Sequence, residues 1–343
     1  MKTIKKLLFV LLAVVMASVA MFGCGETTTP DGGDASGEYT GEISIYMPDG
    51  APALAFAKLM NDNDTLGKES VTYTVVKSEA IGGYVSGKTA TAALMPLNLA
   101  SKLCGEDYKV VSVLTHGNIY VIGKGDATAL ADLKDKKVGV VQLANVPGLT
   151  FRHLLAQAGV DYVENEQASG KVSLYNIADP ATIAAAIKNG TYDYVVAPQP
   201  AAANVCKNVE GASVRIDLNA LYSASGFPQA VLVAKNELCA DTEFMTALET
   251  ALEANAEWIK EEADGTAKNA AAIVDAINAH FAEGATGTLK APALSLEAIK
   301  GSNVYVQSVK ESGVKTLVKD YINNLLRIAP ASAQAVTDAF FLD

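Results

Sequence analysis

The sequence is poor in the residues that build metal sites and disulfide frameworks. It has four cysteines and three histidines among 343 residues. Cys104, Cys206 and Cys239 are far apart and show no CxxC spacing, so neither a disulfide framework nor a zinc knuckle is expected. One disulfide stays open as an alternative, but we expect three buried free thiols. The histidines lie at no metal-ligand spacing, so we expect no metal site and no cofactor.

The sequence also lacks the short motifs that mark common catalytic and nucleotide-binding sites. HExxH, GxSxG, the P-loop and GxGxxG are all absent. Acidic pairs such as Glu261–Glu262 fall in polar stretches, where a solvated helix face is the expected role. We therefore predict no catalytic residues, and the chain is not expected to be an enzyme.

Basic residues are in the minority. The chain has 27 Lys and Arg against 38 Asp and Glu, which gives a formal net charge of −11. No basic patch with interleaved aromatic residues is present. Such an acidic chain does not attract a polyanion, so binding to nucleic acid is not expected.

Long apolar runs are absent except near the N-terminus. Lysines precede the apolar run Leu7–Ala20, which is too short for a comfortable permanent membrane span. The following MFGC resembles a bacterial lipobox, although Phe22 departs from the usual small residue. Residues 1–23 are therefore expected to be an export signal, cleaved before a lipidated Cys24; a buried thiol or half of a disulfide is the alternative for this cysteine.

The segment after the expected cleavage site is rich in Gly, Thr, Pro and Asp. This composition predicts that residues 24–41 form a flexible tether. A lipidated Cys24 followed by such a tether predicts an extracytoplasmic protein anchored to the outer face of the cell membrane.

From Gly41 onward, short β-rich runs alternate with Ala-rich helical stretches. Expected strands are 42–47, 71–77, 91–95, 108–115, 118–125, 137–141, 171–177, 192–197, 212–218 and 229–235; expected helices are 53–62, 80–87, 98–105, 148–160, 180–190 and 200–208. Residues 241–343 are expected to be almost wholly helical. The alternation predicts an α/β fold with mostly parallel sheets, and the chain length predicts two lobes.

Several stretches together resemble the NitT/TauT group of type II periplasmic binding proteins, which are substrate-binding lipoproteins of ABC importers. They are YMPDGAPALAFAKLM (46–60), ATAALMPLNLASKL (90–103), LADLKDKKVGVVQLANVPGLTFRHLL (130–155), YDYVVAPQPAA (192–202) and GFPQAVLVAKNEL (226–238). The resemblance implies a two-lobed type II periplasmic-binding-protein fold with a hinge of two crossing segments and a helical C-terminal tail. The group takes up nitrate, taurine, alkanesulfonates and thiamine-type pyrimidine precursors.

The resemblance also implies how the chain is divided. Lobe one would comprise residues 42–119 and 229–343, and lobe two residues 120–228. The hinge segments would lie near Tyr120–Gly123 and Gln229–Val233. Ligand would bind between the lobes, at the carboxyl ends of the strands, as in other open α/β sheets.

The loops at these strand ends supply the expected ligand-binding residues. They are Met47, Asp49, Gly50, Ala51, Gly82, Gly83, Leu97, Asn98, His116 and Asn118 from lobe one, and Asn145, Val146, Pro147, Gly148, Thr150, Gln199, Phe227 and Gln229 from lobe two and the return to lobe one. Other roles stay open for some of them: a helix cap for Asn98, a plain turn for Gly82 and Gly83, a structural role for His116 and a solvent-facing position for Asp49.

The chemistry of these loops favours one kind of solute. The loops contain no lysine, and Arg152, the nearest arginine, lies inside its helix. Amides, one acid and apolar walls suit a small, neutral or weakly cationic molecule with a flat ring and several hydrogen-bonding atoms. Helix N-termini can also hold a sulfonate without arginine. We therefore favour a pyrimidine-like nitrogen compound over an alkanesulfonate.

The expected mechanism is capture without chemistry. A monomer closes around the solute and delivers it to ABC permease subunits. Two alternatives stay open: a ligand-sensing surface lipoprotein without a permease, and a pyrimidine-synthase-like enzyme of the same fold. The cysteine-rich motif of that enzyme is absent from this chain.

Overall fold

The computed structural model describes residues 37–343 except 69, 224–225, 285–286 and 290–293. The expected export signal (1–23), the expected lipidation site Cys24 and most of the expected tether (24–41) lie outside the described residues.

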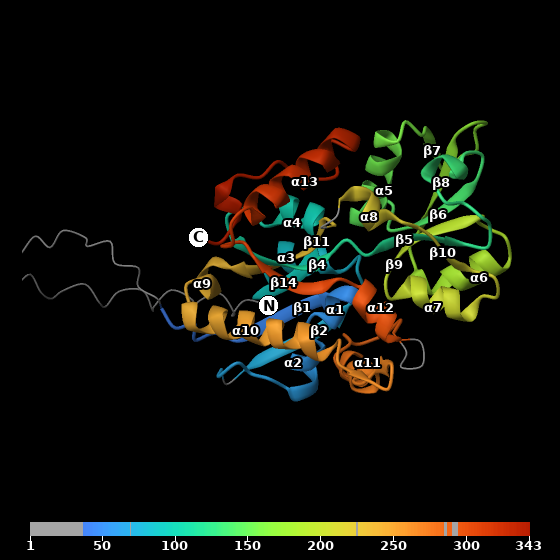
Figure 1. Cartoon of the computed structure of the whole chain (residues 1–343). Coiled ribbons are helices and arrows are strands. Elements are labelled where there is room, and N and C mark those ends of the chain that lie inside the picture. The colour runs from blue at the N-terminus through green and yellow to red at the C-terminus, as the bar shows by residue number, and fades with distance from the viewer. Residues whose placement is uncertain (1–36, 69, 224–225, 285–286, 290–293) are drawn as a thin grey trace, which may run out of the picture. The chain divides into compact units, whose positions relative to one another are not determined.

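Two six-stranded sheets organise the described chain (Figure 1). The first sheet has the order β14-β4-β11-β3-β1-β2, and the second has the order β10-β5-β9-β6-β8-β7. The first sheet consists of β1 (Ile43–Pro48), β2 (Val71–Val76), β3 (Ala92–Pro96), β4 (Tyr108–His116), β11 (Pro228–Lys235) and β14 (Val304–Ser308). The second consists of β5 (Ile119–Gly123), β6 (Lys137–Val141), β7 (Tyr162–Glu164), β8 (Val172–Ile177), β9 (Tyr194–Pro198) and β10 (Ser213–Asp217). A small hairpin pairs β12 (Glu262–Ala263) with β13 (Thr266–Ala267).

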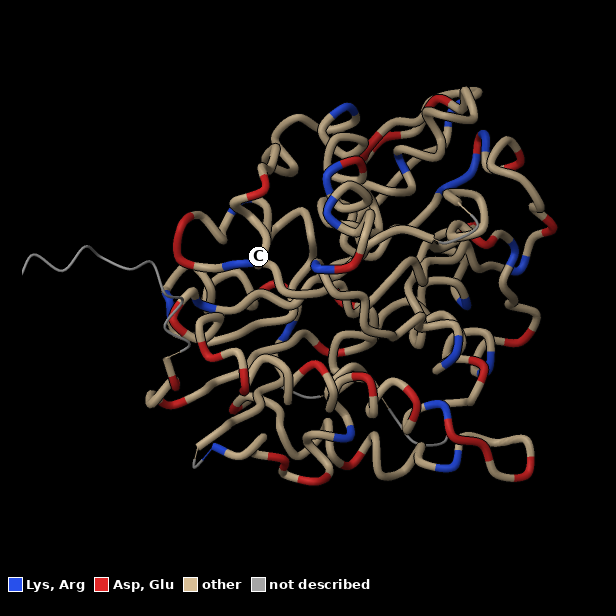
Figure 2. Tube along the Cα trace, turned by 60° about the vertical axis from the view of Figure 1, so that its left-hand side comes forward, with Lys and Arg blue, Asp and Glu red and all other residues tan. Residues whose placement is uncertain are grey.

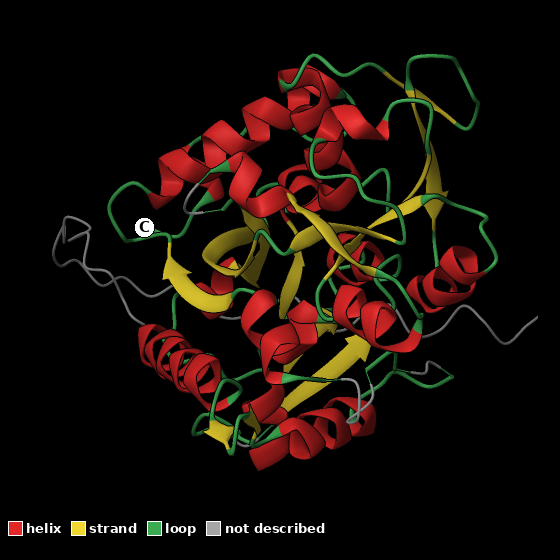
Figure 3. Ribbon diagram, turned by 45° about the vertical axis from the view of Figure 1, so that its right-hand side comes forward, coloured by secondary structure: helices red, strands yellow, loops and turns green. Residues whose placement is uncertain are grey.

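Helices cover both faces of each sheet (Figure 3). On one face of the first sheet lie α1 (Ala51–Leu54), α2 (Ala57–Asp62), α10 (Thr242–Trp258) and α11 (Ala270–Ala279); on the other lie α3 (Ile81–Ser86), α4 (Leu97–Leu103) and α13 (Val314–Ile328). The second sheet is covered by α5 (Val146–Gln157) on one face and by α6 (Ile183–Lys188) and α7 (Ala201–Asn208) on the other. The other helices in the described ranges are α8 (Leu218–Tyr222), α9 (Asn236–Cys239) and α12 (Leu296–Gly301), with 3₁₀ turns η1 (Leu130–Leu133), η2 (Pro180–Thr182) and η4 (Asp338–Phe340).

The central strands are apolar because they are covered on both faces. Ala93–Met95 in β3 and Val195–Ala197 in β9 are fully buried. Strands buried in this way have continuous apolar runs instead of an alternating pattern. The sheets and their helices confirm the predicted α/β fold. The expectation of mostly parallel sheets was wrong, because β11 pairs antiparallel with β3 and β4, and β5 pairs antiparallel with β9 and β10.

The C-terminal region differs from the prediction. Helices α10 to α13 are present, but β14 pairs antiparallel with β4 at the edge of the first sheet. The expectation that residues 241–343 are almost wholly helical was therefore wrong. A short edge strand takes its hydrogen bonds from a partner that is distant in sequence, so its local sequence is a weak signal.

The chain passes between the two sheets twice. It does so at Gly117–Asn118, between β4 and β5, and between the end of β10 at Asp217 and the start of β11 at Pro228. The expected hinge segments Tyr120–Gly123 and Gln229–Val233 lie inside β5 and β11, where sheet pairing holds them. The passages thus precede the expected segments by a few residues, and the lobe boundaries stay a prediction.

The three cysteines among the described residues are free thiols. Cys104 and Cys239 are buried, as expected, whereas Cys206 is only half-buried. Burial raises the pKa of Cys104 to about 12 and that of Cys239 to about 11, so neither forms a reactive thiolate at neutral pH.

Charged residues of both signs are interspersed along the chain (Figure 2). Over the described ranges, no helix is both long enough and apolar enough to cross a membrane.

Candidate functional site

The carboxyl ends of β1, β3 and β4 meet at one edge of the first sheet. β1 and β3 are parallel, and β3 and β4 run in the same direction because both pair antiparallel with β11. The start of β11 lies at the same edge, since Pro228 pairs with His116. This edge, which we call the first edge, brings together the following predicted residues: Asp49, Gly50, Asn98, His116 and Gln229.

The second sheet has a corresponding edge. β6, β8 and β9 are parallel, and β5 begins beside the end of β9, with Ile119 paired with Pro198. The predicted residues Asn145 and Gln199 follow the ends of β6 and β9. Asn118 lies on the passage between the sheets, and its carbonyl accepts a hydrogen bond from the Gln199 amide at 2.9 Å. The passage at Asn118 connects β4 of the first sheet to β5 of the second, and its hydrogen bond links it to the end of β9. The predicted residues of both sheets therefore follow strands that end near this passage.

Asn98 is the second residue of α4 and is 3% exposed. Its Nδ2 donates to the carbonyl of Ser332 at 3.2 Å. Its side chain does not cap the helix, because the N-cap position belongs to Pro96 and carries no side-chain bond. Oδ1 of Asn98 is buried and finds no hydrogen-bond donor among the described residues.

His116 ends β4 and is 2% exposed. Its ring stacks on Tyr305 of β14, with centroids 3.6 Å apart and planes 2° from parallel. Burial, and to a smaller degree the charge of Lys260, lowers the pKa of His116 to about 3, against the opposing effect of a hydrogen bond to the Tyr305 backbone. The imidazole is therefore neutral at physiological pH, and its buried Nε2 has no partner in the described part of the chain.

Asn118 is completely buried. Its Nδ2 donates to the carbonyl of Ser302 at 3.2 Å, just before β14. Its Oδ1 is buried and unpaired within the ranges that the structure describes. Asn118 thus has the same pairing as Asn98: its Nδ2 donates a hydrogen bond, and its Oδ1 has no partner among the described residues.

Phe227 and Gln229 flank the start of β11 and have different surroundings. The Phe227 ring is fully buried and stacks on Tyr321 of α13, with centroids 5.4 Å apart. It also packs against Tyr222 at 5.2 Å, so it belongs to an aromatic core cluster. Gln229 is half-buried, and its Oε1 is buried without a partner among described residues.

Asp49 is held by the protein. Its Oδ2 accepts from the backbone amide and hydroxyl of Thr288, at 2.8 and 2.6 Å. Its Oδ1 accepts from the amide of Gly50 at 2.8 Å. Gly50 has φ +93°, a left-handed backbone conformation that favours glycine, so the strand-to-helix turn explains this residue.

The loop before α5 has structural roles for several predicted residues. Asn145 precedes the helix, and its carbonyl accepts from Leu149 at 2.9 Å. A Cβ on Gly148 would lie 2.2 Å from the Leu143 carbonyl oxygen, so close helix packing requires glycine there. The Thr150 hydroxyl bonds that of Tyr321 and joins α5 to α13. In the second sheet Gln199 likewise uses its Oε1 internally, accepting from Ala203 at 3.0 Å.

The other predicted residues line elements that pack in the core or face outward. Gly83 is exposed and has open space where a Cβ would stand, whereas a Cβ on Gly82 would lie 3.2 Å from Leu99. The predicted apolar residues are buried: Met47, Ala51, Leu97, Val146 and Pro147.

Arg152, the arginine nearest to the predicted loops, is already engaged. Its guanidinium pairs with Glu164 at 2.6 Å and donates to the Leu143 carbonyl at 3.3 Å. It is therefore not presented to a ligand as a free cation.

Sequence reasoning missed the partners that the C-terminal region supplies. The carbonyls of Ser302 and Ser332 fix the two buried asparagines, and Tyr305 provides the ring under His116. Asn118 and Ser302 are separated by 184 residues, so no local pattern links them. The alternation in NVYVQS was the available signal for the strand that carries Tyr305.

Within the described residues, no group of three His, Cys, Asp or Glu side chains is placed to hold a metal ion.

Comparisons with known proteins support the fold through structure alone. No protein-family model and no curated protein sequence matches the chain. An ABC transporter structure from Parabacteroides distasonis has a TM-score of 0.69 and 18% identity, covering 88% of this chain and 99% of that chain. The periplasmic aliphatic sulphonate binding protein SsuA from Escherichia coli has a TM-score of 0.64 and 12% identity, covering 86% and 94%. A zinc-bound ligand-binding component of an ABC-type import system from Staphylococcus aureus has a TM-score of 0.61 and 15% identity, covering 87% and 95%. The chain thus has the fold of two-lobed periplasmic binding proteins.

Proposed function

We propose that the chain is the extracytoplasmic solute-binding protein of an ABC importer, and that it belongs to the NitT/TauT group. It captures a small organic solute between two lobes, comprising residues 42–119 with 229–343 and residues 120–228. It then delivers the solute to permease subunits. No chemical step is required of it.

The observation that carries this proposal is the pairing state of the residues at the first edge and on the adjoining passage. Asn98, His116 and Asn118 are buried, and each keeps one polar atom without a partner in the described chain. Buried polar atoms are nearly always paired in native proteins, and an unpaired one costs about 1–3 kcal/mol. Their position at carboxyl strand ends, beside the passage between sheets, is where open α/β folds bind ligands. The fold likeness to ABC importer components adds independent support.

The solute that we propose is a small pyrimidine-like nitrogen compound. The engaged Arg152 and the amide-rich first edge support this choice over an alkanesulfonate. Closure around the solute follows if its contacts to both sheets form only in the closed state. The closed monomer then docks on the permease.

The sequence features at the N-terminus give the proposed location. A cleaved signal of residues 1–23 and a lipid on Cys24 would hold the protein on the outer face of the cell membrane. Metabolic labelling with a fatty-acid probe tests the anchor: we expect label on the wild-type chain and none on Cys24→Ser.

An uptake assay tests the function itself. Deletion of the gene should abolish uptake of labelled 4-amino-2-methylpyrimidine by the source cells, and the intact gene should restore it. Direct binding without any uptake defect would favour a ligand-sensing surface lipoprotein. Consumption of the solute by the purified chain would instead favour an enzyme.

A further inference from the structure

Three side chains at the first edge and the passage share one unusual state. Asn98, His116 and Asn118 are 3%, 2% and 0% exposed. Each has one polar atom in a hydrogen bond and one that lacks a partner among the described residues. Asn98 follows β3, His116 ends β4 and Asn118 lies two residues beyond β4, with β11 between β3 and β4 in the sheet. All three are thus at the first edge or on the adjoining passage, and their unpaired atoms are considered together.

The paired atom of each side chain identifies the unpaired one. Nδ2 of Asn98 faces the Ser332 carbonyl, and Nδ2 of Asn118 faces the Ser302 carbonyl. A carbonyl oxygen only accepts, so the amide hydrogens must point toward it and each Oδ1 must point away.

The same reasoning fixes the tautomer of His116. The ring is bonded to the backbone of Tyr305, and this bond favours the protonated form, so the ring is the donor. Nε2 is the atom without a partner in the described ranges, which leaves Nδ1 as the donor. In the neutral ring Nε2 is then an acceptor.

One further group at the first edge has the same polarity. Oε1 of Gln229 is a buried acceptor that no donor in the described parts reaches. Asp49, the one acid among the predicted site residues, already accepts from Thr288 and from the Gly50 amide, so it is not counted here. Arg152, which would favour an oxyanion, is paired with Glu164. The unpaired buried atoms of Asn98, His116, Asn118 and Gln229 are therefore all acceptors.

We propose that this site selects a ligand for its N–H groups: an amine, an amidine or an amino-substituted heterocycle. The proposal rests on the proposed solute-binding function and specifies the solute class of the same site. An N–H group satisfies an acceptor that burial has removed from water. A sulfonate, nitrate or carboxylate carries only acceptor oxygens and would place lone pair against lone pair. The site therefore rejects oxyanions, even though the fold resembles that of a sulphonate binding protein.

A matched pair of small molecules tests the selection. Thermal shift and calorimetric titration of the purified full-length chain would compare 4-amino-2-methylpyrimidine with its 4-dimethylamino analogue, which has no N–H group. Ethanesulfonate and nitrate form the acceptor-only arm, and agmatine represents an amidine-like cation. We expect the N–H compounds to bind, the dimethylamino analogue to bind at least about tenfold more weakly, and the oxyanions not to bind.

Two variants separate recognition from folding. Asn118→Leu removes the proposed acceptor and should weaken binding of the N–H compound at least about tenfold. Asn255→Leu is the matched control, because Asn255 is also fully buried but has both polar atoms paired. It should alter thermal stability and leave the dissociation constant of the folded protein unchanged.

The outcomes separate this inference from the proposed function. Tight binding of ethanesulfonate or nitrate would overturn the inference and leave the solute-binding function standing. Equal affinity of Asn118→Leu and wild type would also overturn the inference alone. If the folded chain binds neither the N–H compounds nor the oxyanions, both the inference and the proposed function would be overturned.

Discussion

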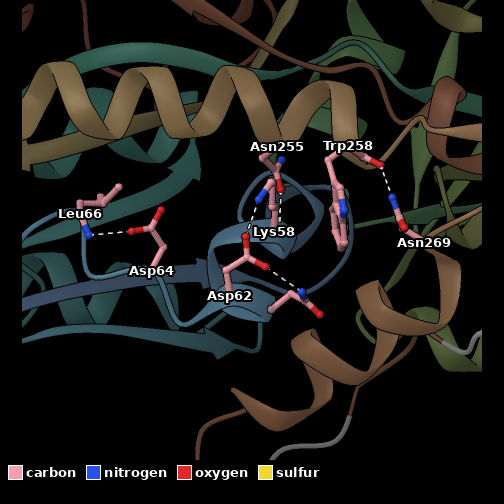
Figure 4. Close-up of polar contacts among 8 residues, drawn as sticks. Lys58, Asp62, Asp64, Leu66, Asn255, Trp258 and Asn269 are labelled. Carbon is pink, nitrogen blue, oxygen red and sulfur yellow. Dashed lines mark hydrogen bonds and ion pairs between the residues drawn. The ribbon is translucent and has the colours of Figure 1, made fainter.

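Buried asparagines in this molecule are of two kinds: Asn255 has both side-chain polar atoms in hydrogen bonds, whereas Asn98 and Asn118 each have only one. Asn255 in α10 accepts from the Lys58 amide at 2.8 Å (Figure 4). It also donates to the Leu54 carbonyl at 3.0 Å. Asn98 and Asn118 donate in the same way but keep an unpaired Oδ1 within the described chain.

The difference separates a structural role from a binding role for one residue type. A fully paired buried amide recovers its desolvation cost inside the fold and rigidifies the contact between α10 and the α1–α2 turn. A half-paired amide keeps part of that cost, which a ligand with a matching donor removes. Violations of complete pairing are expected at functional sites.

The largest change in the free energy of unfolding is expected when the fully paired amide of Asn255 is removed. Asn255→Leu leaves the buried Lys58 amide and Leu54 carbonyl without partners, which should lower the free energy of unfolding by about 3 kcal/mol. Urea denaturation measures this change. A loss below about 1 kcal/mol would mean that Asn255 is not the structural member of the pair.

The next largest effect is the pH dependence that His116 gives to the free energy of unfolding. His116 has a native pKa of about 3 and an unfolded pKa of about 6.5, so only the unfolded state takes up the proton between these values. Stability should therefore be full above pH 6.5 and fall on acidification, by up to about 1.4 kcal/mol per pH unit. His116→Phe keeps a ring on Tyr305 and should flatten this slope between pH 6 and 4.

The control for that experiment is His153, whose pKa is also lowered by burial. His153→Phe should remove a smaller part of the slope, because His153 is the more exposed of the two. An unchanged slope in His116→Phe would show that His116 is not buried in its neutral form.

Replacing the half-paired amide should have a smaller effect on stability than on binding. Asn118→Leu loses one hydrogen bond but also removes an unpaired acceptor, so its free energy of unfolding should change by less than about 1.5 kcal/mol. Urea denaturation beside Asn255→Leu measures the contrast. Equal losses in both variants would remove the distinction between the two groups.

The smallest change in the free energy of unfolding is expected at Asp241, whose carboxylate lies at the start of α10. Asp241 caps this helix at the Phe244 amide (3.0 Å) and also accepts from the Tyr39 amide and Lys68. Burial alone would raise the pKa of Asp241, but the bonds from Lys68 and the two amides lower it overall. The charged Asp241 carboxylate therefore stabilises the folded protein fully at pH values above its unfolded pKa. This stabilisation is lost as the pH falls through its pKa in the folded protein.

Asp241→Asn keeps the shape and removes the charge. We expect it to lower the free energy of unfolding by about 1 kcal/mol at pH 7 and to have no effect near pH 2. Denaturation at the two pH values measures the difference. A deficit that persists at pH 2 would assign the effect to altered packing instead of charge.

Much of the fold follows from local sequence, but the state of the site does not. Alternating β-rich and Ala-rich segments predict most strands, and the first edge collects Asn98 and His116 because both follow strand ends. The carbonyls that orient Asn98 and Asn118 lie 234 and 184 residues away, so the direction of each amide was not predictable. Residue type alone predicted a ligand wall at Phe227, but it could not show that this ring packs on Tyr321; the ligand contact itself stays a prediction.

The most direct test is calorimetric titration of 4-amino-2-methylpyrimidine into wild type, Asn118→Leu and Asn255→Leu under conditions where all three are folded. The pairing difference predicts at least about tenfold weaker binding for Asn118→Leu and wild-type affinity for Asn255→Leu. Weaker binding by Asn255→Leu with wild-type affinity in Asn118→Leu would contradict the assignment of the half-paired amides to the ligand.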